Sequence, residues 1–259
     1  MEQEVYKQFY DIEKSHWWFQ GMRTICRQMI VQSTDIESKT NAHCLDIGCG
    51  TGLWTRELDS LGSVTGMDLS VDALEFCKER GLSRILRASA GEIPLKNESV
   101  DLVCALGLIE HLDDDAVFLK ELLKVCRPGG HVLILTSAYK FLWCEHDDAV
   151  HHKRRYTRRG LKLLIEDCGF HVTRISYVNM SLLAPIVLFR GVRRALQIFA
   201  GPKVMSAEKG TPDFFSIPSA LNRLLYLVLA IEGKLMSVVD LPFGVGLIAV
   251  ITKKETKES

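Results

Sequence analysis

The chain has 259 residues, of which 47% are hydrophobic and 25% charged, a composition that excludes collagen, coiled coil and disordered protein. Lysine plus arginine and aspartate plus glutamate are equal at 32 each, so no overall field draws the chain to nucleic acid or to an anionic membrane. The eight cysteines include no C-x-x-C pair, and the N-terminal residues lack the apolar core of a secretory signal. No apolar run reaches the roughly 20 residues that cross a bilayer, and we expect a cytoplasmic protein.

In chain order, residues 1–40 are expected to form an N-terminal helical cap. Short runs rich in Val, Leu and Ile then predict strands at 43–47, 63–67, 85–88, 100–106, 131–136, 171–178 and 246–252. The amphipathic stretches between them predict helices near 53–60, 71–80, 114–126 and 157–168. Near-continuous apolar strands between such helices indicate an α/β fold, formed by residues 41–179 and 240–253, with an open, mostly parallel twisted sheet covered by helices on both faces.

Residues 180–239 do not fit this alternation and are expected to form a helical insertion. They contain two apolar helical candidates, at 181–199 and 220–239, and Pro185 is expected to interrupt the first one early. A Gly/Pro/Ser-containing stretch at 201–219 joins them. An insertion of this size is typical of a lid, a homodimer interface or a membrane contact. A lid or an interface is the preferred interpretation, and the arginines near the apolar face keep membrane contact as the third alternative.

A glycine-rich segment, GCGTG at 48–52, follows the first predicted strand directly. Such a loop lets backbone N–H groups approach a ligand that a Cβ atom would keep away. Its G-x-G-x-G spacing differs from the G-x-G-x-x-G of dinucleotide-binding proteins, which argues against NAD. The next predicted strand leads to Asp68, where a carboxylate can accept both hydroxyls of a ribose. The two features together predict a nucleoside site at the carboxyl edge of the sheet.

Six sequence elements follow one another over about residues 42–136. They are LDIGCGTG at 45–52, the acidic Asp68, AGEIP at 90–94, SVDLV at 99–103, EHL at 110–112 and RPGG at 127–130. In this order and at these spacings they resemble the signature of class I S-adenosylmethionine-dependent methyltransferases. The resemblance implies a Rossmann-like sheet with an antiparallel last strand, S-adenosyl-L-methionine as cofactor and S-adenosyl-L-homocysteine as product.

The resemblance also implies where the cofactor binds. Asp46 and the backbone of the glycine loop hold its methionine end, and Asp68 takes the ribose. Ser89 stands where many relatives carry the aspartate that receives the adenine amino group, so Ser89 or a backbone carbonyl has to serve instead. The full set of expected cofactor-binding residues is Trp18, Arg23, Asp46, Gly48, Cys49, Gly50, Asp68, Leu69, Ser89, Ala90 and Leu106.

The chemistry of a sulfonium methyl group demands little catalytic machinery, because positioning alone can supply about 7–11 kcal/mol of the barrier. A general base is needed only where the acceptor is an O–H or N–H group. His111, which follows the predicted strand at 100–106, is the first candidate for that base, and a structural role is its alternative.

A second polar set follows the predicted strand at 131–136 and consists of WCEHD at 143–147 and HKRRYT at 152–157. This position at the carboxyl edge favours acceptor binding over a merely solvated charged face. The expected acceptor-binding residues are Trp143, His146, His152, Arg154, Arg155 and Tyr156, with His146 and Tyr156 also as catalytic candidates. An arginine suits a carboxylate or phosphate, so we expect an anionic group on the acceptor. A metal site at His146, Asp147 and His152 is a weaker alternative, and no metal is expected.

The segment HWWF at 16–19 joins HKRRYT in resembling a type 11-like subgroup of bacterial methyltransferases. Many members of that subgroup are associated with surface-glycan, lipid or natural-product pathways, and their acceptors are mostly unassigned. One of the aromatic rings is placed to lie over the cofactor sulfonium as a cation–π contact, whereas packing of the N-terminal helix is the alternative.

The sequence therefore predicts an S-adenosylmethionine-dependent methyltransferase with a small-molecule or lipid-like acceptor methylated on O or N. We expect no nucleic-acid partner, a monomer or homodimer, and a cytoplasmic location, with peripheral contact at the inner face of the membrane as an alternative. Two other functions stay open: a non-catalytic S-adenosylmethionine-binding regulatory protein, and a protein or nucleic-acid methyltransferase.

Overall fold

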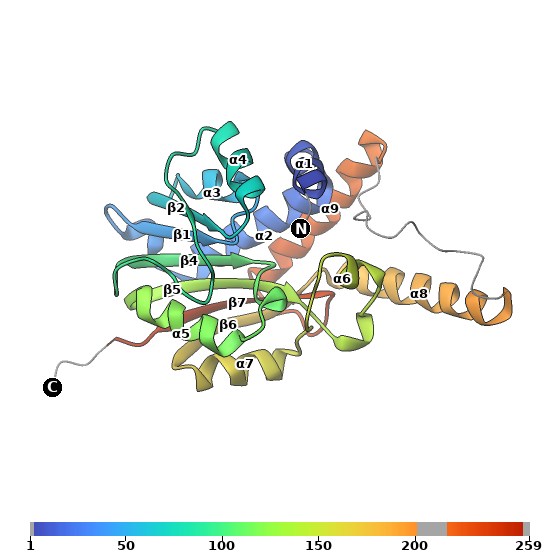
Figure 1. Cartoon of the computed structure of the whole chain (residues 1–259). Coiled ribbons are helices and arrows are strands. Elements are labelled where there is room, and N and C mark those ends of the chain that lie inside the picture. The colour runs from blue at the N-terminus through green and yellow to red at the C-terminus, as the bar shows by residue number, and fades with distance from the viewer. Residues whose placement is uncertain (1–2, 201–216, 256–259) are drawn as a thin grey trace.

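The computed structural model describes residues 3–200 and 217–255, and of residues 193–200 the backbone alone. A seven-stranded sheet forms its centre (Figure 1). The strands are β1 (His43–Ile47), β2 (Ser63–Asp68), β3 (Ile85–Arg87), β4 (Val100–Leu106), β5 (Cys126–Ser137), β6 (Phe170–Val178) and β7 (Gly246–Lys253). Their order is β3-β2-β1-β4-β5-β7-β6, with the first five strands parallel and β7 antiparallel to both β5 and β6. The predicted mostly parallel sheet with an antiparallel last strand is confirmed.

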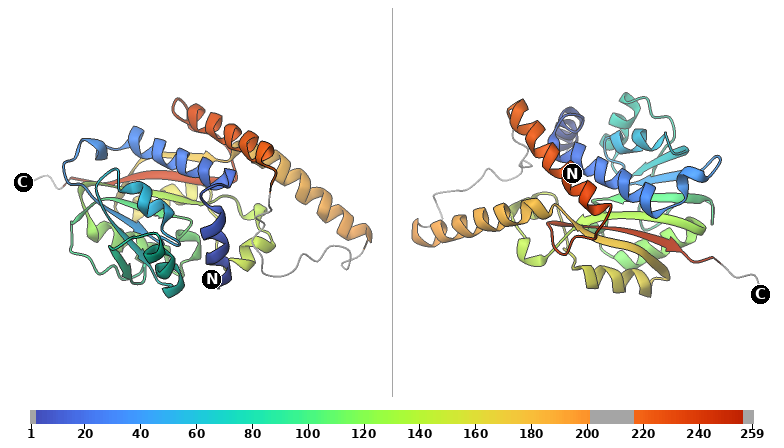
Figure 2. Two further views of the ribbon diagram at one scale, coloured as in Figure 1. Left: turned by 90° about the horizontal axis from the view of Figure 1, so that it is seen from above. Right: turned by 180° about the vertical axis from the view of Figure 1, so that it is seen from behind.

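Helices cover both faces of this sheet (Figures 1 and 2). They are α1 (Gln3–Ile12), α2 (Trp17–Ser33), α3 (Leu53–Leu58), α4 (Val71–Glu79), α5 (Asp115–Val125), α6 (Glu145–Ala149), α7 (Arg158–Asp167), α8 (Met180–Ala200) and α9 (Ser219–Met236), with short 3₁₀ turns η1 (Ile36–Ser38), η2 (Ile109–His111) and η3 (Lys140–Leu142). Helices α2 and α9 lie on one side of the sheet, and α5 and α7 lie on the other. Side-chain caps fix several starts; for example, the Asp114 carboxylate accepts the Val117 N–H of α5 at 2.9 Å.

The central strands are buried on both faces, as their continuous apolar sequences require. All residues of β4 except Leu106 are buried, and so are the first six residues of β7. Large side chains from the covering layers complete this core, among them Ile25 and Met29 of α2 and Phe118 of α5. The sheet is thereby a rigid platform for whatever lies at its edges.

The parallel strands bring four segments to one edge of the sheet, because the carboxyl ends of parallel strands point the same way. The glycine loop follows β1, and Asp68 ends β2. The turn η2 follows β4, and residues 138–157 follow β5. This carboxyl edge is therefore where the predicted cofactor and acceptor residues meet.

Two local expectations fail at prolines. Strand β5 begins at Cys126 and includes Pro128, whereas the sequence placed its start at residue 131. The register between β4 and β5 shifts in this region, and an irregular strand end tolerates a residue without an N–H. Helix α8 runs through Pro185, so the predicted early interruption is wrong. Pro185 is the sixth residue of the helix, where its ring removes one backbone hydrogen bond near the N-terminus.

The insertion folds as α8 and α9, two long helices that leave the sheet in different ways. Helix α9 packs along α2. Helix α8 extends away from the sheet as a projecting arm (Figure 1). The Glu232 carboxylate of α9 ties the start of α8, because it accepts both the N–H and the hydroxyl of Ser181 at 3.0 Å. Most of the joining stretch at 201–219 lies outside the described residues.

Candidate active site

The glycine loop borders open space at the carboxyl edge. Gly48, Gly50 and Gly52 have φ angles of +72°, +53° and +81°, which L side chains rarely adopt. A Cβ atom at Gly50 would meet no atom within 4 Å, and the same holds at Gly107, just after β4. Backbone at these two positions therefore lines space that a ligand can occupy.

Asp68 is held beside this loop by backbone donors. Its Oδ2 atom accepts the Gly50 N–H at 2.9 Å, and its Oδ1 atom accepts the Ser70 N–H at 2.9 Å. Each carboxylate oxygen can accept two hydrogen bonds, so each keeps one position for a further donor. Two remaining acceptor positions match the two hydroxyls of a ribose. The next residue, Leu69, is 63% exposed and stands beside them.

Asp46 lies deeper, at the centre of the same edge, and is 2% exposed. The Thr55 hydroxyl donates to its Oδ2 atom at 2.6 Å. Burial raises the pKa of Asp46 to about 7, although the hydrogen bond from Thr55 lowers it in part, and the nearby Asp68 charge adds a smaller upward shift. A cationic group bound beside Asp46 would offset that burial, as the ammonium of a bound methionine would. The glycine backbone, Asp68 and Asp46 thus fit an S-adenosyl amino acid.

The N-terminal helix α1 lies over this part of the edge, within the 1–40 segment for which the sequence analysis expected a helical cap without naming its contacts. The Glu13 carboxylate, just after α1, accepts from the Thr51 hydroxyl of the glycine loop and pairs with Arg80. The Arg80 guanidinium also lies 4.2 Å from the Tyr10 ring centroid. Tyr6 is buried, and burial together with the nearby Asp68 charge raises the pKa of its phenol to about 12. The only sequence signal for this cover is the pair of tyrosines four residues apart.

The two N-terminal residues expected at the cofactor have other contacts. Arg23 donates to the Glu13 carbonyl at 2.6 Å and pairs with Glu57 of α3 at 2.6 Å. Trp18 is half-buried against the core, with its ring 5.0 Å from that of Phe19 in an edge-to-face arrangement. Both residues hold α2 to its neighbours, and their contact with a cofactor stays a prediction.

The remaining cofactor candidates line the ends of β3 and β4. Ser89 is exposed, and its hydroxyl accepts the Gly91 N–H at 3.2 Å. Ala90 is buried beside it, and Leu106 is half-buried at the end of β4. Cys49 lies inside the glycine loop with its sulfur 3.8 Å from that of Cys77. The exposed Ser89 hydroxyl keeps a lone pair and a proton with which it can hydrogen-bond to the adenine base of a cofactor. Ser89 needs this capacity if it is to replace the aspartate that many relatives carry at this position.

On the acceptor side, the buried Asp147 organises residues 143–157. Its carboxylate is 0% exposed and accepts the His152 Nδ1 atom at 2.7 Å, the Arg155 Nε atom at 2.7 Å and the Cys144 N–H at 2.8 Å. Burial opposes ionisation of Asp147, yet these three donors hold its pKa well below the ordinary value. Asp147 is therefore an ionised acceptor at neutral pH.

Three of the histidines at this edge, His111, His146 and His152, are neighbours. The His152 ring centroid lies 4.6 Å from that of His111 and 6.4 Å from that of His146. Because Asp147 is ionised, Nδ1 of His152 carries the donated proton, which leaves Nε2 able to accept one. Burial, together with the nearby His152, lowers the pKa of His111 to about 4, so His111 is neutral at physiological pH.

The other expected acceptor residues contact the chain itself. Arg155 also donates to the Ala138 carbonyl at 3.0 Å, and Arg154 pairs with Asp115 at 2.8 Å. The Tyr156 hydroxyl donates to the same Asp115 at 2.9 Å, and burial plus this contact raises its pKa above the ordinary value. The Trp143 indole donates to Asp148 at 3.0 Å. These contacts fasten the segment to η2, α5 and β5.

Glu110 is a buried carboxyl group whose role the sequence analysis missed. It is 2% exposed, accepts the Thr136 hydroxyl at 2.7 Å, and has its pKa raised by burial. Its carbonyl accepts the Lys153 N–H at 2.8 Å, so Glu110 links the end of β4 to the HKRRYT segment. A glutamate between the apolar Ile109 and Leu112 was the available signal.

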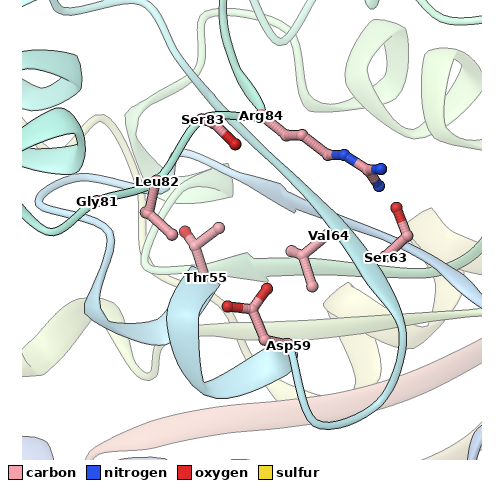
Figure 3. A pocket seen from close by; sticks show the side chains of 8 residues that line it. All are labelled: Thr55, Asp59, Ser63, Val64, Gly81, Leu82, Ser83 and Arg84. Atoms are coloured by element: carbon pink, nitrogen blue, oxygen red, sulfur yellow. The ribbon is translucent and has the colours of Figure 1, made fainter.

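A small pocket elsewhere on the molecule lies away from these residues (Figure 3). It is lined by Thr55, Asp59, Ser63, Val64, Gly81, Leu82, Ser83 and Arg84. Ser63 begins β2, whereas Asp68 ends it, so the pocket lies at the amino edge of the sheet. Within residues 3–200 and 217–255, no group of three His, Cys, Asp or Glu is arranged to hold a metal ion. No helix in the described part of the chain has the length and apolar character that a bilayer crossing requires.

Comparison with known proteins agrees with this geometry. Residues 45–134 match the family model of a methyltransferase domain. Two curated relatives are demethylmenaquinone methyltransferases of Staphylococcus aureus. The protein of strain MRSA252 is 34% identical over 112 residues, which are 40% of this chain and 46% of the relative. The protein of strain JH9 is 33% identical over 122 residues, which are 44% of this chain and 50% of the relative. The chain spans about half the length of the curated relatives it matches.

Solved structures share the fold over most of the chain. A methyltransferase from Archaeoglobus fulgidus, described as S-adenosylmethionine-dependent, superposes with a TM-score of 0.56 at 17% identity, over 90% of this chain and 93% of its own. A chain of the Haloferax volcanii complex that contains the Trm112 methyltransferase activator gives a TM-score of 0.60 at 14% identity, over 99% of both chains.

The strand order and the solved structures define the fold of class I, S-adenosylmethionine-dependent methyltransferases. Residues 45–134 are the part of the chain that matches a methyltransferase domain.

Proposed function

We propose that the whole chain transfers a methyl group from S-adenosylmethionine to a hydroxyl or amine of a small-molecule or lipid-like acceptor. The observation that carries the proposal is the Asp147–His152 pair, 2.7 Å apart, at the same sheet edge as the glycine loop and Asp68. The curated relatives, named for methylation of demethylmenaquinone, support a small, lipid-like acceptor class.

The cofactor half of the reaction rests on four positions. Backbone at Gly50 and Gly107 leaves room for the ligand, Asp68 offers two acceptor positions to the ribose, and Asp46 offers a carboxylate to the ammonium. When bound, the cofactor supplies a methyl group that is electrophilic because it sits on a sulfonium. The chain itself has to orient the acceptor and exclude water.

We assign the general base to His152. Its Nε2 atom is suited to take the proton as the O–H or N–H bond of the acceptor breaks, and the ionised Asp147 stabilises the imidazolium that results. His111 is a poorer base at neutral pH, because its pKa of about 4 leaves little driving force for accepting a proton. We propose that His111 instead forms part of the wall against which the His152 ring is held.

The expected anionic group on the acceptor receives no support from the arginine contacts. Arg155 is engaged by Asp147, and Arg154 is engaged by Asp115. The charge of each guanidinium is thus balanced by a carboxylate of the chain. The proposal therefore rests on proton removal at His152 rather than on recognition of an acceptor anion.

The experiment is a methyl-transfer assay with the cofactor and demethylmenaquinol or simpler hydroquinones, with the gain of one methyl group read by mass spectrometry. We expect His152→Ala to lower turnover about 10²–10⁴-fold while cofactor affinity is unchanged. The control is His171→Ala, an exposed histidine on β6 that leaves the carboxyl edge intact. A His152→Ala protein with wild-type turnover on a methylated acceptor would contradict the assignment of the base.

A further inference from the structure

The outer face of α9 is apolar and exposed. Leu224, Leu227, Ile231 and Leu235 are 44–66% exposed and follow one another at spacings of three or four residues. That spacing places them in one stripe along the helix surface. The opposite face is also apolar and is covered, because α9 packs along α2. Packing against α2 requires only the covered apolar face of α9. The exposed apolar stripe is therefore available to another partner.

Helix α8 adds a second exposed set of large apolar side chains. Val187, Leu188, Phe189 and Val192 are 44%, 69%, 64% and 51% exposed, on an arm that projects from the sheet (Figures 1 and 2). Phe141 of η3 is also 69% exposed, and the Leu142 carbonyl beside it accepts from Arg190 of α8. We call these residues of η3, α8 and α9 the apolar surface.

The charged residues in the sequences of α8 and α9 are basic, apart from one acid. Helix α8 carries Arg190, Arg193 and Arg194 and no acidic residue. Helix α9 carries Arg223 and Lys234, both exposed, and its single acid, Glu232, is buried at 4% exposure. The chain as a whole has equal numbers of acidic and basic residues, so this excess of cations is local. A surface that combines exposed apolar side chains with the exposed cations Arg223 and Lys234 complements an anionic, apolar partner.

We propose that α8, α9 and Phe141 dock the protein on a membrane surface that contains anionic lipid. The apolar side chains enter the boundary between headgroups and acyl chains, and the cations pair with lipid phosphates. A second copy of the chain fits less well, because a two-fold interface would bring the cations of both copies together without an exposed acid on either helix. The contact lies along the interface and involves no crossing of the bilayer.

This inference goes beyond the proposed function, because it concerns where the protein binds and requires no methyl transfer. The test is co-sedimentation of the full chain with vesicles of phosphatidylcholine alone and of phosphatidylcholine mixed with phosphatidylglycerol. We expect binding to the mixed vesicles to be at least tenfold tighter and to fall at about 1 M salt, where the Debye length is about 3 Å. Such a result stands whether or not an acceptor is methylated.

Two kinds of variant locate the contact. Leu188→Glu with Ile231→Glu should weaken binding to mixed vesicles at least tenfold, whereas the control Leu163→Glu, a 49% exposed leucine on α7, should leave it unchanged. Arg223→Gln with Lys234→Gln, which alter only exposed side chains, should weaken it about fivefold for each charge removed. The second pair keeps the test valid if the glutamate variants fail to fold.

Three outcomes would overturn the proposal. The wild-type chain could ignore mixed vesicles, or Leu163→Glu could lose binding as strongly as the apolar-surface variants. The third outcome is that light scattering shows a dimer, that Leu188→Glu dissociates it, and that the protein does not bind vesicles. This result would assign the apolar surface to contact with a second copy of the chain. If the protein does not sediment with vesicles but transfers methyl groups fully to a soluble hydroquinone, the membrane proposal fails while the proposed function stands.

Discussion

The cofactor side and the acceptor side of the carboxyl edge use their polar groups differently. Around β1 and β2, backbone at Gly50 faces open space and Asp68 keeps two acceptor positions. After β5, the carboxylates and guanidinium groups bind one another, as Asp147 does with Arg155. The first region is built to receive a ligand, whereas most of the second holds its own loop in place. A polar motif at a sheet edge can therefore be structural, and in the acceptor segment Nε2 of His152 is the nitrogen that we propose to act on a ligand.

The largest expected effect tests whether the acceptor segment is structural. Asp147→Ala leaves the Arg155 guanidinium buried without a carboxylate, and we expect the free energy of unfolding to fall by about 3–5 kcal/mol. The measurement is urea unfolding at neutral pH, with Asp148→Ala, an exposed neighbour, as control. If both variants lose less than about 1 kcal/mol, the contrast between the two regions fails.

Acid should remove the same stabilisation. The pKa of Asp147 is depressed in the folded chain, so its contribution is complete above the unfolded value near 4 and is lost as pH falls through the lower folded value. Wild-type stability should therefore fall more steeply than that of Asp147→Ala below about pH 4. Parallel curves for the two proteins would contradict the ionised state assigned to Asp147.

On the cofactor side, the matching substitution should cost affinity instead. Asp68→Ala removes the acceptor of two ribose bonds, each worth roughly 1.5–3 kcal/mol, so calorimetry should show S-adenosylmethionine binding weakened about 100-fold or more. Asp59→Ala is the control, because Asp59 lines the amino-edge pocket of Figure 3. Weaker binding for Asp59→Ala alone would move the cofactor site to that pocket.

The pH dependence of cofactor binding sharpens the comparison further. Asp46 has a pKa of about 7 in the free protein, and a bound ammonium should lower it, so the free state carries more protons. Affinity should then fall as pH drops below 7, by up to about tenfold per unit. Asp46→Asn should bind more weakly at pH 7 and show a flat profile between about pH 5.5 and 7. Equal slopes for both proteins would exclude Asp46 as the titrating group.

The same contrast explains what could be predicted from the sequence. The strands at 43–47 and 100–106 were placed to the residue, because apolar runs bounded by turns are local signals. Gly50 and Asp68 meet because parallel neighbouring strands end at one edge, which follows from the alternation alone. The arrangement of the cofactor region could therefore be predicted from local sequence signals.

The side-chain contacts of the acceptor region could not be predicted in the same way, because they join residues far apart in the chain. Arg154 pairs with Asp115, and Arg155 donates to the Ala138 carbonyl, without any periodicity that links the partners. Composition marked Arg154 and Arg155 as candidate ligands, but only the fold reveals that the carboxylates of Asp115 and Asp147 already engage them. The structural role of Glu110, which was quoted within EHL at 110–112 without any contact assigned to it, was missed for the same reason.

The smallest effect concerns the cover that α1 places over the cofactor side. Tyr6 is buried near Asp68 and Ser70, so Tyr6→Phe removes one neutral hydroxyl from beside the ribose-binding carboxylate. We expect cofactor affinity to change by about 2–10-fold, the equivalent of one neutral hydrogen bond of ~0.5–1.5 kcal/mol. Tyr10→Phe is the matched control on the same helix, because its ring keeps the contact with Arg80. A change in calorimetry for Tyr6→Phe alone assigns α1 to the binding site, whereas no change in either variant leaves it as a packed helix that the cofactor does not contact.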